Sequence, residues 1–123
     1  DRPLSRGLGD VYKRQVGKRF SKRGGYAIEI HFDAYGKYGV GSGLIPPFSE
    51  QPNKIDESIA RTFGRFPVLF RGGLGAPRRQ IRVLEIGKLE GLLEKNLRNV
   101  KTRNKTIKLL ATEIVQAFLN GII

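Results

Sequence analysis

The chain has 123 residues, a formal net charge of +12 at pH 7 and no cysteine. A chain of this length forms one domain or part of one. The lack of cysteine excludes a disulfide framework and a cysteine-type zinc site. No apolar run approaches the length of a membrane span. The basic charge favours polyanionic partners, such as nucleic acids or acidic cell-wall polymers, without choosing between them.

The first 15 residues differ from the rest in their expected origin. Residues 5–15 read SRGLGDVYKRQ, and their back-translation resembles, codon by codon, the adapter and transposase end of short-read sequencing libraries. We therefore interpret residues 1–15 as an adapter-derived, disordered segment and exclude it from fold predictions. On this interpretation, residues 16–123 are the C-terminal part of a single domain whose upstream part is missing, so an export signal is not observable.

A helix end and a strand are predicted next along the chain. Residues 16–25 are basic and end in two glycines, as at the last turn of a helix followed by a loop. In residues 26–34 (YAIEIHFDA), apolar and polar residues alternate, which predicts a strand with one polar face. That face carries Glu29, His31 and Asp33. A glycine-rich loop then leads to a short strand at 43–45, where two prolines follow.

Two further strands and three helices complete the prediction. Asn53 is a candidate N-cap for a helix that runs to Phe63, and residues 68–70 form a short apolar strand candidate. A basic, glycine-rich loop over 71–79 precedes a strand at 81–86. Residues 89–97 predict a short helix, and Asn104 a cap for the last one, which has a clear apolar stripe. Strands that alternate with helices predict an α/β layered fold, a mixed twisted sheet flanked by helices.

Two residues are candidates for a catalytic or metal-binding role. His31, the only histidine, can be a structural partner of a neighbouring carboxylate, or a metal ligand or general base. Glu85 lies in an otherwise apolar strand, where a carboxylate needs a partner. It can pair with an arginine of the preceding loop, or act as a catalytic acid/base at a strand end. The arginines in question are Arg71, Arg78 and Arg79.

Three segments in order resemble the amidase-3 family of zinc-dependent N-acetylmuramoyl-L-alanine amidases. The sequence IEIHFDA at 28–34 resembles the family's "S-I-H-A-N-A" strand, and VLEIGKL at 83–89 resembles its "V-L-V-E-x-G-F-L-S-N". The closing helix at 107–122 is similar to its terminal "I-A-x-A-I-x-x-G-I". Glu29, Phe32, Asp33 and Lys88 depart from these motifs, which predicts a divergent branch, of phage or environmental bacterial origin.

The resemblance implies the phosphorylase/hydrolase-like layered fold of that family and hydrolysis of the amide bond between N-acetylmuramic acid and L-alanine in peptidoglycan. It implies a Zn²⁺ cofactor with His31 as one ligand and Glu85 as the catalytic residue. A further histidine and a glutamate ligand would lie upstream, so we expect this truncated chain to be inactive. We also expect Glu29 and Asp33 to orient His31, and Arg71, Arg78 and Arg79 to attract substrate carboxylates.

Other functions compete with this hypothesis. The charge and the arginine- and glycine-rich loop also fit a basic nucleic-acid-binding module, and a non-catalytic cell-wall-binding domain is a third possibility. For an amidase, the expected location is the cell envelope, periplasmic or extracellular, or release of a phage-encoded, endolysin-like enzyme at lysis. We expect peptidoglycan as its partner and no stable protein partner.

Overall fold

The computed structural model describes residues 3–33, 42–47, 51–64, 77, 80–88 and 91–123, without the side chains of residues 3–11, Asp33 and Lys88. In chain order, its elements are α1 (Pro3–Lys22), β1 (Ile28–Asp33), β2 (Ser42–Ile45), α2 (Lys54–Phe63), β3 (Arg82–Lys88), α4 (Leu92–Arg98) and α5 (Arg103–Ile122). The fold is therefore mixed α/β, as predicted. The strand predicted at 68–70 lies outside the described residues. Among the described residues, no helix is both long and apolar enough to cross a membrane.

The three strands form a mixed sheet with β3 in the centre. Their order is β1-β3-β2, with β1 parallel and β2 antiparallel to β3. β1 and β3 pair in regular register from Ile28 opposite Arg82 to His31 opposite Glu85, and the register shifts just after His31. Because β3 has a neighbour on both sides, its apolar residues Val83 and Leu84 are fully buried.

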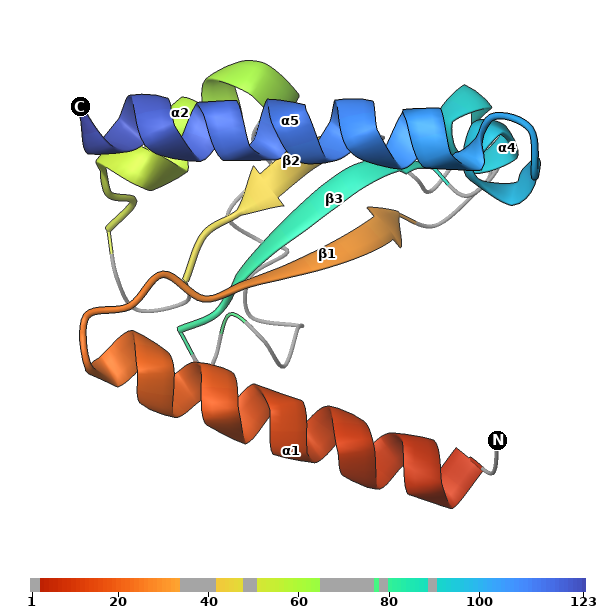
Figure 1. Cartoon of the computed structure of the whole chain (residues 1–123). Coiled ribbons are helices and arrows are strands. Elements are labelled where there is room, and N and C mark those ends of the chain that lie inside the picture. Colours follow the sequence, from red (N-terminus) through yellow and green to blue (C-terminus); the bar gives the residue numbers. More distant parts are fainter. Residues whose placement is uncertain (1–2, 34–41, 48–50, 65–76, 78–79, 89–90) are drawn as a thin grey trace.

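The helices lie on both sides of the sheet (Figure 1). On one side, α2 and α5 cover a core that includes Leu44, Ile59 and Leu84. The other side is covered by α1, with Gly17 close to Ile81. The strand predicted at 81–86 explains this division, since successive side chains of a strand point to opposite faces. Leu84 and Ile86 join the core under α2 and α5, whereas Val83 joins a smaller cluster with Ile81.

Helix α2 begins as the sequence predicts. The Asn53 side chain accepts a hydrogen bond from the Asp56 backbone N–H, and the Asp56 carboxylate accepts one from the Asn53 N–H. This reciprocal pair is a capping box, which satisfies two backbone donors at the helix start. The helix ends at Phe63, before Gly64 with its φ of 101°. Asp56 therefore has a fixed place at the end of α2 nearest the start of the strands.

Two predicted boundaries are wrong. Residues 1–15 were expected to be disordered, but α1 starts at Pro3, and residues 10–16 contain no proline or glycine that would interrupt a helix. Asn104 was expected to cap the last helix, but α5 already begins at Arg103. A turn leads directly into it, since the Asn99 carbonyl accepts hydrogen bonds from the N–H groups of Thr102 and Arg103. The Thr102 carbonyl then accepts the first helical hydrogen bond, from the Thr106 N–H. Asn104 is thus inside the helix.

Candidate active site

The paired strands β1 and β3 place His31 and Glu85 side by side. They are register partners in the parallel pair, so their side chains leave the sheet on the same face. Nδ1 of His31 lies 3.5 Å from Oε1 of Glu85. This distance allows an ion pair and is at the outer limit of a hydrogen bond. Two candidate residues 54 positions apart in the sequence thus meet in one place.

Glu85 is a buried carboxylate that is only partly satisfied. Its side chain is 9% exposed, and its Oε2 accepts no hydrogen bond from the part of the chain that the structure describes. A buried acceptor without a donor costs free energy, so such an atom in a native protein calls for an explanation. The predicted arginine partners Arg71, Arg78 and Arg79 lie outside the described residues.

Glu29 contacts the other ring nitrogen of His31. Its Oε1 lies 2.9 Å from His31 Nε2, and Arg14 of α1 donates to the same carboxylate from Nε at 2.9 Å and from a terminal nitrogen at 3.2 Å. The imidazole therefore lies between two carboxylates, with Glu29 held in turn by a guanidinium. This is the contact expected of a residue that orients His31. The side chain of Asp33, the other predicted orienting residue, lies outside the described residues.

The pKa values of His31 and Glu29 respond to these contacts. The hydrogen bond with Glu85 raises the pKa of His31 above its ordinary value; burial opposes this shift, and Glu29 adds to it. Burial tends to raise the pKa of Glu29, but the hydrogen bond and charge of Arg14, together with His31, outweigh it and lower that pKa. The arrangement thus favours the protonated form of the His31 ring.

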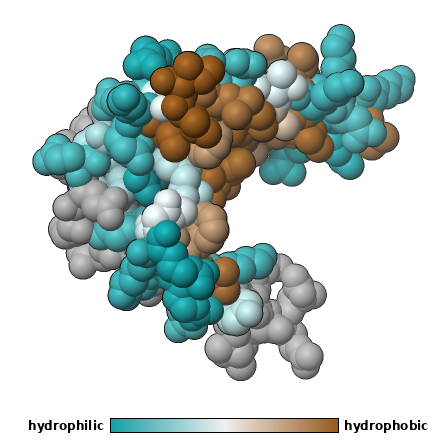
Figure 2. All heavy atoms as spheres, turned by 60° about the vertical axis from the view of Figure 1, so that its left-hand side comes forward, coloured by the Kyte–Doolittle hydropathy of each residue, from teal (hydrophilic) through white to brown (hydrophobic). Residues whose placement is uncertain are grey.

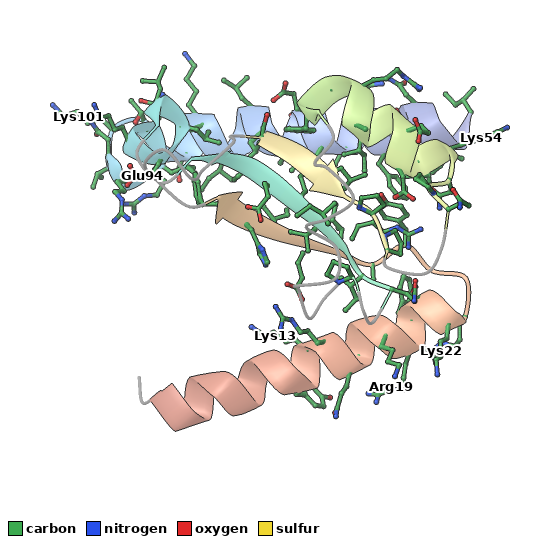
Figure 3. The ribbon with its side chains drawn as sticks, turned by 180° about the vertical axis from the view of Figure 1, so that it is seen from behind. Lys13, Arg19, Lys22, Lys54, Glu94 and Lys101 are labelled. Atoms are coloured by element: carbon green, nitrogen blue, oxygen red, sulfur yellow. The ribbon has the colours of Figure 1, made fainter. Side chains whose placement is uncertain are left out.

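A pocket of about 200 Å³ opens beside these residues, lined by Lys13, Arg14, Glu29 and His31. It lies between α1 and β1, and Figure 2 shows the molecule hollowed between α1 and the layers above it. Lys13 is on the side of α1 that faces the sheet, whereas Arg19 and Lys22 point away from it (Figure 3). The side chains from α1 were not predicted as site residues, because they belong to the segment that was excluded as adapter-derived.

A complete metal site is absent from the described residues, which hold no group of three or more His, Cys, Asp or Glu side chains able to bind an ion. No known family model, curated protein or solved structure matches the chain. The functional interpretation therefore rests on the sequence resemblance and on the geometry around His31 and Glu85.

Proposed function

We propose that residues 16–123 are part of a zinc-dependent N-acetylmuramoyl-L-alanine amidase that hydrolyses peptidoglycan. One observation supports this most: His31 and Glu85, to which the family resemblance gives the roles of zinc ligand and catalytic residue, are 3.5 Å apart on paired strands. Had the two side chains left the sheet on opposite faces, the assignment would have failed. The same resemblance implies the amidase-3 fold, and a mixed sheet flanked by helices is compatible with a part of it.

The local chemistry fits a cation at this place. If Nε2 of a neutral His31 donates to Glu29, then Nδ1 is an acceptor that faces the Glu85 carboxylate, also an acceptor. Two acceptors at this distance need a proton or a metal ion near them. His31 would be one ligand of the zinc, and the unsatisfied Oε2 of Glu85 leaves room for a further donor.

Within the proposed reaction, each residue has one task. Bound zinc would supply a Lewis acid that polarises the substrate carbonyl and acidifies water. Glu85 would accept a proton from the attacking water and pass it to the leaving amine. Glu29 would hold the His31 ring in one orientation and tautomer. The products would be the free lactyl carboxylate of the muramic acid and a stem peptide with an N-terminal L-alanine.

The present chain does not contain the whole ligand set that the proposal requires. It has one histidine, whereas the family resemblance implies two histidine ligands and a glutamate. A single histidine does not hold zinc tightly, so this polypeptide alone is expected to be inactive, and the activity belongs to a full-length protein that includes residues 16–123. That enzyme would act in the cell envelope or, if encoded by a phage, at lysis.

Purified peptidoglycan tests this proposal. The full-length gene is recovered from the same source, and its product is incubated with peptidoglycan, with and without a chelator. We expect stem peptides with new L-alanine amino termini, their loss on chelation and their return with Zn²⁺. Release that continues in the chelator, cleavage at another bond, or no release from a protein that carries the upstream ligands would each contradict the proposal.

Nucleic-acid binding is the second candidate, favoured by the exposed basic side chains on α1 that point away from the sheet, such as Arg19 and Lys22. Binding of this kind releases counterions, so its affinity falls steeply as salt increases. A steep salt slope in a DNA gel shift, retained after deletion of residues 1–15, would favour this candidate over the amidase.

A further inference from the structure

A buried polar network lies on the opposite face of the sheet from His31 and Glu85. Arg82 donates to Asp56 from Nε at 3.0 Å and from a terminal nitrogen at 3.4 Å, and the Tyr26 hydroxyl donates to Asp56 at 2.6 Å. The guanidinium also lies over the Tyr26 ring, 4.5 Å from its centroid. Asp56 is fully buried and Arg82 almost so. The Asp56 carboxylate thus accepts hydrogen bonds from both the Arg82 and the Tyr26 side chains.

This network joins three elements at one end of the sheet. Tyr26 precedes β1 by two residues, Arg82 is the first residue of β3, and Asp56 belongs to the capping box of α2. Ile28, two residues after Tyr26, pairs with Arg82 in the strand register. The contacts therefore tie the starts of β1 and β3 to each other and to a helix terminus.

The register of β1 against β3 decides whether the site exists. No tight turn joins parallel strands, so none can set their register. A slip of one residue would send the whole set of side chains to the opposite face, and His31 would leave Glu85. Just beyond His31 the pairing is already irregular. The register at His31 must therefore be set from the start of the strands, where the network lies.

We propose that Tyr26, Asp56 and Arg82 are positioning residues that hold His31 against Glu85 by fixing the register of β1 on β3. A role of this positioning in catalysis rests on the proposed amidase function. The position of His31 next to Glu85 does not depend on activity and can be measured in the present chain.

The single histidine makes the measurement direct, because every imidazole signal in an NMR spectrum of this chain belongs to His31. In Asp56→Asn, the carboxylate that binds Arg82 and Tyr26 is replaced by an amide of similar size. We expect the ¹⁵N shifts of the ring nitrogens to move, as the ring loses Glu85. The matched control is Ser58→Ala, which removes a buried hydrogen bond of 2.6 Å to the Ala117 carbonyl, also from α2, and should leave the ring signals unchanged.

A milder variant keeps the test decisive if Asp56→Asn does not fold. Tyr26→Phe keeps the ring and the ion pair but removes one hydrogen bond, and it should move the His31 signals in the same direction by less. Folded variants with wild-type ring signals, or equal shifts in Ser58→Ala, would overturn the proposal. If the full-length protein has no amidase activity but these shifts appear, the positioning role stands and only the proposed function fails.

Discussion

In the full-length enzyme, Glu85→Gln is expected to lower kcat by about 10²–10⁴-fold, the usual contribution of a positioned acid/base. The amide keeps the size of the side chain but cannot take a proton from water. Because Glu85 is buried next to His31, no solvent base can replace it easily. Release of L-alanine termini from peptidoglycan, measured as initial rates over a range of substrate concentrations, gives kcat and KM separately.

The control for this variant is Glu113→Gln on the exposed face of α5. It removes the same charge from α5, which covers the opposite face of the sheet from His31 and Glu85, and should keep kcat within about twofold, since surface changes away from a site have small effects. Equal losses in both variants would mean that charge or stability, and not the carboxylate of Glu85, controls the rate. An unchanged kcat in Glu85→Gln would remove this residue from the catalytic role.

Asp56→Ala is expected to lower the free energy of unfolding by about 3–5 kcal/mol, the cost of removing one partner of a buried ion pair. The variant leaves the guanidinium of Arg82, which is 4% exposed, without its carboxylate. It also removes half of the capping box of α2. Urea denaturation of this chain, followed by circular dichroism, measures the loss.

An exposed ion pair provides the comparison. Arg98 pairs with Glu94 one helical turn away and is 74% exposed, so Arg98→Ala should cost less than about 1 kcal/mol. Similar losses in the two variants would show that the Asp56–Arg82 pair is no more important than a surface contact.

Much of the fold was predictable because it rests on local patterns. Alternation of apolar and polar residues placed β1, a short and largely apolar segment placed β3, and Asn53 marked the start of α2. The alternation also put Glu29 and His31 on one face of β1. What the pattern could not supply was the relative register of the strands, which depends on contacts between segments far apart in the chain.

The residues around His31 and Glu85 were predicted less completely. Arg14, which binds Glu29, belongs to the residues that were excluded from the fold, and a helix there had no amphipathic signal strong enough to predict it. The Tyr26–Asp56–Arg82 network was also missed, because each member is ordinary in its own segment. Arg82 carried the one usable signal: it is a charged residue on the face of β3 that also bears Leu84 and Ile86, and it needed a buried partner.

The most direct test of the central claim is an NMR titration of His31 in the wild-type chain and in Glu85→Gln. In the part of the chain that the structure describes, the charged groups near the ring are Glu85, Glu29 and Arg14, with Lys13 in the adjoining pocket. Glu85 stabilises the protonated ring, so the wild-type pKa should lie above the ordinary value of about 6.5 and fall when the carboxylate is neutralised. Glu113→Gln should leave it unchanged. A wild-type pKa at or below the ordinary value that Glu85→Gln does not move would contradict the pairing of His31 with Glu85, and with it the active site proposed for this protein.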